Sequence, residues 1–252
     1  MPFRLKAFGL HLTGSATVLT LVLGTLYLGW YRWPGWYLCD VKHVVIVLMG
    51  VDLALGPLLT LVIASPRKPY RVLARDVSII VAVQLFALSY GSINLWNGRP
   101  LYYALTENVL QVVQAYDLDP AEVALAAKQD APLRPHWYSL PRWIWAPTPP
   151  VSSPADPAAK SQDTVKIDPI EVPRLYRPWQ AGLADLRAQL RPVAKAAGFY
   201  RPDILRLTQR MQAEGIPTDQ DNSITLTGRG YPPLLAVFDP NTLQLKEYLS
   251  AR

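Results

Sequence analysis

An aspartate stands inside an almost wholly apolar run of this sequence. Asp52 lies in the segment GVDLALGPLLTLV, and Gly56 and Pro57 follow it about one helical turn later. A carboxylate at the centre of a lipid bilayer costs about 2.5 to 3.5 kcal/mol, so such an acid is expected to be protonated, paired or turned toward a protein interior. Pro57 has no N–H to donate, which predicts a kink in the helix just past Asp52 and a lateral groove beside it.

The polar partners of Asp52 are sought at the same depth in other apolar runs. Counting at 1.5 Å per residue places Thr20 and Gln84 within about one helical turn of that depth. Three roles stay open for the group: hydrogen bonds that hold the helices together, contact with a polar group on the helix of another protein, and a proton path.

No pattern of catalytic or metal-ligating residues is present. His136 is the single histidine after residue 96, Cys39 is the single cysteine, and neither GxSxG nor HExxH occurs. Asp219 and Asp221 have the D-x-D spacing of some sugar-nucleotide sites, but Asp and Asn are also ordinary turn residues. We expect no catalytic residue, metal or cofactor, and hence no enzyme.

Three long apolar stretches predict transmembrane helices at about 7–30, 43–64 and 77–96. Each is close to the length needed to cross about 30 Å of hydrocarbon. The region 1–96 is therefore predicted to be a three-helix membrane region. The aromatic ending of the first stretch, YLGWYRWPGWY, is unlike a signal-peptide cleavage site, so we expect that helix to stay in the mature protein.

The orientation follows from the short connections. Arg67, Lys68, Arg71 and Arg75 lie between the second and third stretches, and two more basic residues precede the first. Lysine and arginine near a span are retained in the cytoplasm, which predicts a cytoplasmic N-terminus and a periplasmic region from residue 97 onward. A bacterial inner membrane is the expected location.

The remaining residues, 97–252, predict an extracytoplasmic α+β domain. A hairpin is expected over 101–118, a helix capped by Asp119, helices over 177–198 and 202–215, and a C-terminal hairpin over 233–249. The proline-rich tract of about 132–169 is predicted to be an exposed loop.

Net charge argues against nucleic acid as a partner. The chain carries +6, but eight Lys and Arg against three Asp in residues 1–96 leave only about +1 for the rest. No basic face for a phosphate backbone is expected there. The basic residues instead suit the surface of membrane lipid.

The membrane region resembles the TfpX/TfpZ family of type IV pilin accessory proteins. The similarity lies in RLKAFGLHL near the start, GVDLALGPLLTLVIASPRK in the second stretch and RDVSIIVAVQLFALSYG in the third. It continues more weakly through VPRLYRPW (172–179) and VFDPNT (237–242). The tract around 132–169 aligns with no family pattern.

This resemblance implies an inner-membrane protein that assists or modulates assembly of its cognate type IV major pilin, without catalytic residues. The spans would meet the pilin's membrane helix, and the periplasmic domain would meet its head. The protein would thus act as a chaperone, with the pilus assembly machinery as a further partner. Small residues at Gly14, Gly24, Gly50 and Gly56 would allow close helix approach or simply pack the three spans together. Two alternatives stay open: a membrane enzyme that modifies the pilin, for instance by glycosylation, and a membrane sensor that reads an extracytoplasmic ligand.

Overall fold

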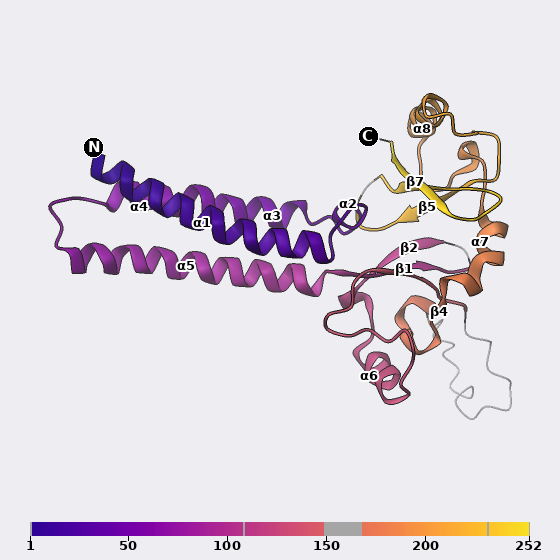
Figure 1. Cartoon of the computed structure of the whole chain (residues 1–252), viewed down its shortest axis with the longest axis horizontal. Coiled ribbons are helices and arrows are strands. Elements are labelled where there is room, and N and C mark those ends of the chain that lie inside the picture. The colour runs from indigo at the N-terminus through magenta and orange to yellow at the C-terminus, as the bar shows by residue number, and fades with distance from the viewer. Residues whose placement is uncertain (1, 108, 149–167, 231, 252) are drawn as a thin grey trace. The chain divides into compact units, whose positions relative to one another are not determined.

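The chain divides into two compact units. The computed structural model describes residues 2–107, 109–148, 168–230 and 232–251. One unit spans Met1–Arg99 and is helical, and the other spans Pro100–Arg252 and combines a sheet with helices (Figure 1).

The first unit consists of three long rods and a short connecting helix. Its elements are α1 (Pro2–Gly29), α2 (Gly35–Leu38), α3 (Lys42–Met49), η1 (Gly50–Leu55), α4 (Gly56–Ile63) and α5 (Tyr70–Asn97). Here α3, η1 and α4 follow one another directly and form the second rod, and η1 is a π-helical segment. The three rods are long and apolar enough to cross a membrane, as the sequence predicts.

The third rod begins earlier than the apolar stretch that predicts it. Helix α5 starts at Tyr70, directly after Pro69, whereas hydropathy places the span at 77–96. Hydropathy locates the apolar part of a helix, while the backbone continues until a residue such as proline ends it. Arg71 and Arg75 therefore lie on the first turns of α5 and not in a loop.

Close side-chain contacts hold the three rods together. The Tyr31 hydroxyl donates to the Leu95 carbonyl at 2.6 Å, and Trp30 meets Trp96 edge to face with 4.9 Å between ring centroids. At Gly91 a Cβ atom would lie 2.6 Å from the Leu48 side chain, so α5 approaches α3 where α5 has no side chain. Leucine packed against glycine is a typical way for membrane helices to approach closely.

The described residues of the second unit form a seven-stranded mixed sheet. Its strands are β1 (Pro100–Leu105), β2 (Leu110–Gln114), β3 (Arg142–Trp145), β4 (Arg177–Pro178), β5 (Ser223–Thr227), β6 (Leu234–Phe238) and β7 (Leu245–Ser250). The strand order is β4-β3-β1-β2-β5-β6-β7. Pairs β1/β3 and β2/β5 are parallel, and the other neighbours are antiparallel. This is the α+β architecture that the sequence predicts.

Helices and short 3₁₀ turns connect and cover the strands. The α-helices are α6 (Pro120–Lys128), α7 (Leu183–Gln189) and α8 (Arg201–Ala213). The 3₁₀ turns are η2 (Ala115–Asp117), η4 (Pro169–Glu171), η5 (Pro173–Leu175), η6 (Trp179–Gly182) and η7 (Val193–Lys195).

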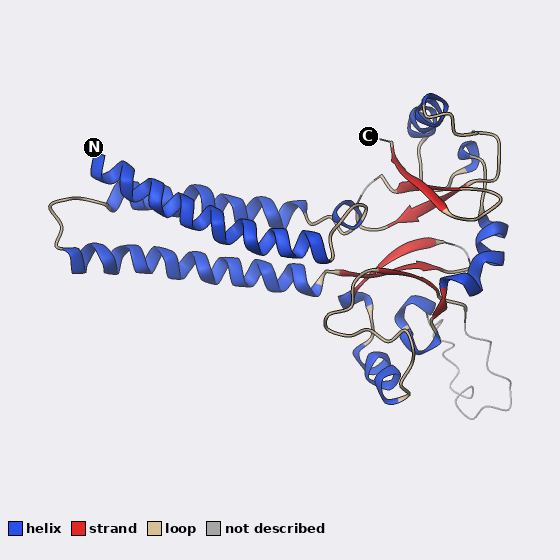
Figure 2. Ribbon diagram, in the orientation of Figure 1, coloured by secondary structure: helices blue, strands red, loops and turns tan. Residues whose placement is uncertain are grey.

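The sheet curls strongly, so its two halves face each other (Figure 2). Trp143 of β3 and Tyr248 of β7 lie 6.5 Å apart between ring centroids. Four strands separate β3 from β7, which in a flat sheet would place them about 24 Å apart. Aromatic rings fill the concave side, with Trp179 and Phe238 both against Trp143.

Two apolar cores cover the outer faces of the curl. On the half with β1 and β3, Tyr102, Val113 and Ile144 are buried with residues of the following segments. On the half with β6 and β7, the α8 residues Leu207 and Met211 pack on the sheet. Alternate residues of one strand thus serve the inner aromatic cluster and the outer core.

Both predicted hairpins are confirmed, and so is the predicted start of α6. Strand β1 pairs antiparallel with β2, and β6 with β7. The Asp119 side chain accepts a hydrogen bond from the Ala121 N–H at 2.9 Å and so caps α6. Glu122 does not complete a capping box, because its carboxylate pairs with Arg174 Nε at 2.8 Å.

The predicted helix over 177–198 is mostly wrong. Only Leu183–Gln189 is α-helical there, and Arg191 instead pairs with Ser223 at the end of β5. The residue before a proline is displaced from the helical region, so Pro192 opposes continuation of the helix. Helix α8 does end as predicted, with Gly215 at φ +70°.

The proline-rich tract is not wholly a loop. Strand β3 lies inside it, and Ile144 of that strand is fully buried between β1 and β4. The RWIW run is short and flanked by prolines, so the composition of the tract does not indicate a strand. The flanking prolines lie outside the four residues of β3 that pair with β1. Residues 149–167 of the tract lie outside the described residues.

Candidate functional site

Asp52 lies in the middle of the second rod, within its π-helical segment. Its side chain is 4% exposed. In this segment the backbone repeat is one residue longer than in an α-helix, so the Gly56 N–H donates to the Val51 carbonyl, five residues back. π-helical turns of this kind often occur at functional sites.

Pro57 leaves the next carbonyl in this register without its donor. Continuing the five-residue pattern would join the N–H of residue 57 to the Asp52 carbonyl, and proline has no N–H. Gln84 of α5 supplies the missing donor, because its Nε2 donates to that carbonyl oxygen at 3.2 Å. The Val51 carbonyl lies 3.5 Å from the same nitrogen.

Gly56 leaves room for the Gln84 amide to take the place of the missing backbone N–H. A Cβ atom at residue 56 would lie 2.1 Å from Gln84 Nε2, far inside contact distance. Gly56, Pro57 and Gln84 thus act together. Pro57 leaves the Asp52 carbonyl without a backbone donor, Gly56 leaves space beside it, and the Gln84 amide occupies that space. The three residues come from two different rods and join them.

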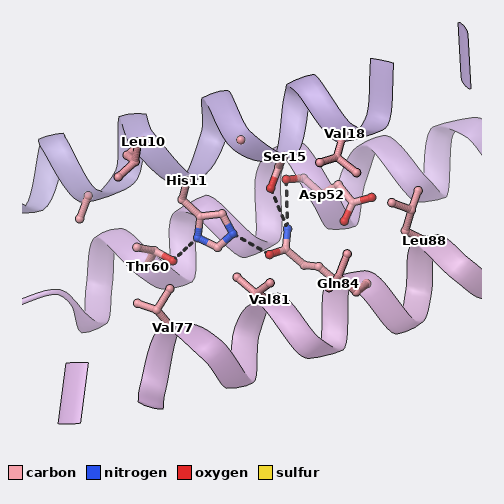
Figure 3. Close-up of a pocket in the computed structure, with 13 residues that line it drawn as sticks. Leu10, His11, Ser15, Val18, Asp52, Thr60, Val77, Val81, Gln84 and Leu88 are labelled. Atoms are coloured by element: carbon pink, nitrogen blue, oxygen red, sulfur yellow. Dashed lines mark hydrogen bonds between the residues drawn. The ribbon is translucent and has the colours of Figure 1, made fainter. Parts of the chain in front are cut away.

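His11 of α1 extends the polar group to the first rod. Its Nε2 lies 2.7 Å from Gln84 Oε1, and its Nδ1 lies 2.6 Å from Thr60 Oγ1 (Figure 3). The Gln84 amide nitrogen faces main-chain carbonyls, which only accept, so the amide oxygen must face His11. His11 therefore donates through Nε2, and in the neutral ring Nδ1 accepts from the Thr60 hydroxyl.

A hollow opens beside this network. It has a volume of about 440 Å³ and is lined by α1 on one side and α5 on the other, with Asp52 and Thr60 between them (Figure 3). Most of its wall is apolar, including Leu10 and Leu85, which are 79% and 51% exposed and form its rim. The hollow is therefore accessible from the outer surface of the bundle.

The Asp52 carboxylate lines this hollow, and one of its oxygens lacks a hydrogen-bond donor among the described residues. Its Oδ2 is buried, and no residue in the described part of the chain gives it a hydrogen bond. The direct hydrogen bond from Gln84 goes to the main-chain carbonyl of Asp52 and does not satisfy Oδ2. A buried acceptor that lacks a donor is costly, so this oxygen is able to accept a hydrogen bond from a group that enters the hollow.

The structure brings four of the five predicted cluster residues together and places the fifth elsewhere. Asp52, Gly56, Pro57 and Gln84 meet as described, whereas Thr20 is exposed and lines a second hollow of about 540 Å³. We therefore correct the pairing of Thr20 with Asp52. Depth along a helix does not fix the direction of a side chain around it, and that direction decides the contact.

Helix α1 contributes His11 and Ser15 to the network, and neither residue was predicted from the sequence. Ser15 Oγ accepts from Gln84 Nε2 at 3.4 Å. The two are four residues apart and so share one face of the helix. An ionisable side chain in an otherwise uncharged span, with a second polar residue at i+4, could have revealed them. Thr60, eight residues after Asp52, was also not predicted, because its partner is His11.

The glycines predicted to allow close helix approach divide into two kinds. Only Gly56 among them touches another rod, and at Gly14, Gly24 and Gly50 an added Cβ would meet nothing within 4 Å. Gly14 lines the hollow beside Asp52, and Gly24 lines the second hollow. These two glycines leave open space at the surface of the bundle.

The basic residues used for orientation gather near one end of α5. Arg67 and Lys68 lie in the turn before it, and Lys68 Nζ is 3.0 Å from an Asp76 carboxylate oxygen. Arg75 lies 3.6 Å from the same side chain. Arg67, Arg71 and Arg75 are exposed, as groups at a lipid headgroup surface would be.

The other chemistry-bearing residues lie on exposed loops of the second unit. Asp219 and Asp221 are exposed in the turn before β5, next to the buried Asn222. His136 is exposed and stacks on Tyr138 with 5.4 Å between ring centroids. Within the described ranges, no three His, Cys, Asp or Glu side chains are grouped as a metal site would require.

Fold and site together define a protein with three candidate membrane spans, a polar network within them and an α+β unit after them. Three proteins of Dichelobacter nodosus are similar to this chain over 116 residues, or 46% of it. The fimbrial assembly protein of serogroup I is 29% identical over 45% of its length, and that of serogroups C1 and C2 is 28% identical over 88%. The fimbrial assembly protein of serogroup E1 is 27% identical over 45% of its length.

The chain thus spans about half the length of the serogroup I and E1 proteins that it matches. No protein-family profile and no solved structure matches it.

Proposed function

We propose that this protein is a non-catalytic accessory of fimbria assembly that acts on the pilin of type IV pili. The observation that carries the proposal is the hollow between α1 and α5, with the buried Asp52 carboxylate in its wall. The names of the Dichelobacter nodosus relatives support the process, and the spans support action in a membrane. The protein would lie in the bacterial inner membrane.

The groove at the hollow suits one face of an apolar helix. Its wall is mostly apolar, with leucine and valine as the commonest residues, and it is open along the exposed rim residues Leu10 and Leu85. In lipid, helices associate through close packing and polar contacts, because apolar area alone gives little advantage over lipid tails. A groove combined with an unsatisfied carboxylate offers both. We infer that the pilin's membrane helix is held here before assembly.

The second unit would contact the globular part of the pilin in the periplasm. Strand β7 is last in the strand order, so among the described residues its outer edge has no neighbouring strand. An exposed strand edge can pair with an extended segment of a partner. The basic residues near the start of α5 favour a cytoplasmic N-terminus and hence a periplasmic second unit.

A bulky side chain in the groove tests the proposal. Gly14→Leu fills the hollow beside Asp52, and nothing within 4 Å of the Cβ position opposes it. Gly24→Leu makes the same change in the second hollow and is the matched control. Each variant is returned to cells that lack the gene, and surface pili and total pilin are measured by immunoblot.

The proposal expects loss of surface pili with Gly14→Leu, near-normal pili with Gly24→Leu, and equal amounts of both variants in the membrane. Normal piliation by Gly14→Leu would show that the groove is not used. Normal piliation after complete deletion of the gene would overturn the role in fimbria assembly altogether.

A further inference from the structure

The Asp52 carboxylate lies at mid-depth of a membrane span and lacks a partner for one oxygen. Asp52 is the eleventh of the 22 residues of the span Lys42–Ile63, and it is only 4% exposed. Its Oδ2 has no hydrogen-bond partner among the described residues, and the side chain lines the hollow between α1 and α5. An acceptor in this position needs a donor, and an ionised acceptor needs a positive charge.

The donors nearest in the network are engaged elsewhere. The Gln84 amide nitrogen is directed at the Asp52 main-chain carbonyl and at Ser15 Oγ. Both ring nitrogens of His11 are occupied, one by Gln84 and the other by Thr60. The network therefore holds the backbone around Asp52, and among the described residues it leaves Oδ2 of the carboxylate without a donor.

The wall of the hollow carries an acid without a fixed counter-charge. No lysine or arginine is among the described residues that line it. The two ring nitrogens of His11 face Thr60 and Gln84, and no hydrogen bond joins them to the Asp52 carboxylate. Charge complementarity therefore favours a cationic occupant over a neutral one.

We propose that Asp52 is the acceptor for a cationic nitrogen, an ammonium or a guanidinium, carried by an apolar helix of the pilin that lies in this groove. This inference rests on the function proposed above and adds the chemistry by which the helix is recognised. An ion pair formed inside the membrane is stable only when both partners are present, so an empty groove and an unpaired cation on the free helix both favour the complex.

The open space at Gly14 supplies the path for the entering group. It lies on the wall of the hollow, and no atom lies within 4 Å of the position of a Cβ atom there. A helix that approaches between Leu10 and Leu85 thus meets no side chain at this residue. The cationic group can reach the carboxylate while the rest of the helix stays in the apolar part of the groove.

Photo-crosslinking in cells with the cognate pilin tests the inference. A photoreactive residue replaces Leu85, which lines the hollow, or Phe86, which is 76% exposed but does not line it. Both are combined with native Asp52, with Asp52→Asn and with Asp52→Leu. Asparagine keeps the size and hydrogen bonding of the side chain and removes the charge, whereas leucine removes both.

We expect pilin to be recovered from position 85 and not from position 86. Asp52→Asn and Asp52→Leu should both lower recovery about tenfold or more, because a hydrogen bond to a charged group is the contact that is lost. Mass spectrometry of the crosslinked peptide from the native protein should place a lysine, an arginine or another ammonium within about one helical turn of the linked residue.

Two results separate the inference from the proposed function. If native Asp52 gives no pilin at position 85, the pilin helix is not in the groove and the groove-based function fails. If pilin is recovered but Asp52→Asn changes nothing, or if the linked peptide has no cationic nitrogen nearby, the function stands and the charge recognition is overturned. Because the peptide is identified from the native protein, that outcome does not depend on the folding of any variant.

Discussion

Gln84 of α5 donates a hydrogen bond to the main-chain carbonyl of Asp52 at 3.2 Å and replaces the N–H that Pro57 lacks. This contact gives Gly56 and Pro57 of the second span a shared structural role. It also ties the third rod to the second at the depth of the polar network.

The contact predicts coupling between Gln84 and Pro57. Gln84→Leu should lower the free energy of unfolding by about 1 to 2 kcal/mol, since a buried carbonyl loses its donor. Pro57→Ala restores an N–H to the backbone, so Gln84→Leu should cost less in that background. Thermal unfolding of the four proteins in detergent micelles measures the coupling. Equal cost in both backgrounds would show that Gln84 does not replace the missing N–H.

Gly56→Ala is expected to disrupt the network from the other side. The new Cβ would lie 2.1 Å from Gln84 Nε2, and relief of such overpacking costs about 1 to 3 kcal/mol. Gly50→Ala, at the start of the same π-helical segment, meets nothing within 4 Å and is the matched control. Unfolding in micelles should show a lower midpoint for residue 56 alone. A similar change in both variants would point to loss of glycine flexibility instead.

His11 is expected to hold one tautomer. Because Gln84 Oε1 accepts from Nε2, the neutral ring should carry its proton on Nε2 and leave Nδ1 bare. Nitrogen-15 NMR of the labelled protein in lipid distinguishes the two nitrogens, and His43, which is largely exposed, provides the comparison. Thr60→Val should change the Nδ1 shift and leave Nε2 nearly unchanged. A proton found on Nδ1 alone would mean that the Gln84 amide is reversed.

The turn between β6 and β7 predicts a dependence on pH. Asp239 accepts from the N–H groups of Thr242 and Asn241 and pairs with Lys246, which together lower the pKa of its carboxyl from 3.8 to about 2. A lowered pKa means that the stabilisation is fully present above pH 3.8 and is lost as the pH falls toward 2.

Asp239→Ala tests this turn. It should lower the unfolding midpoint near neutral pH, and the difference from the native protein should shrink between about pH 4 and 2. Asp239→Asn keeps an acceptor for the two N–H groups and is the control for loss of charge alone. A difference that persists unchanged at pH 2 would exclude ionisation of Asp239 as its source.

The sequence by itself determined the features that depend on local composition. Three apolar stretches of membrane length specify three long helices, because a helix satisfies its own backbone polar groups within lipid. Alternating apolar runs around turn residues likewise specify both hairpins, and Asp119 specifies the start of α6. An acid in an apolar run identified Asp52 as the centre of a site.

Only the tertiary structure decided how these elements meet. The rotation of α1 brought His11 and Ser15 to Gln84 and turned Thr20 away, and depth counted along a helix does not give this rotation. Strand β3 is short and flanked by prolines, so its place beside β1 depends on pairing with a distant segment. The sequence contains Gly56, Pro57 and Gln84, but their shared role exists only because two helices approach closely enough for one side chain to complete the backbone of the other.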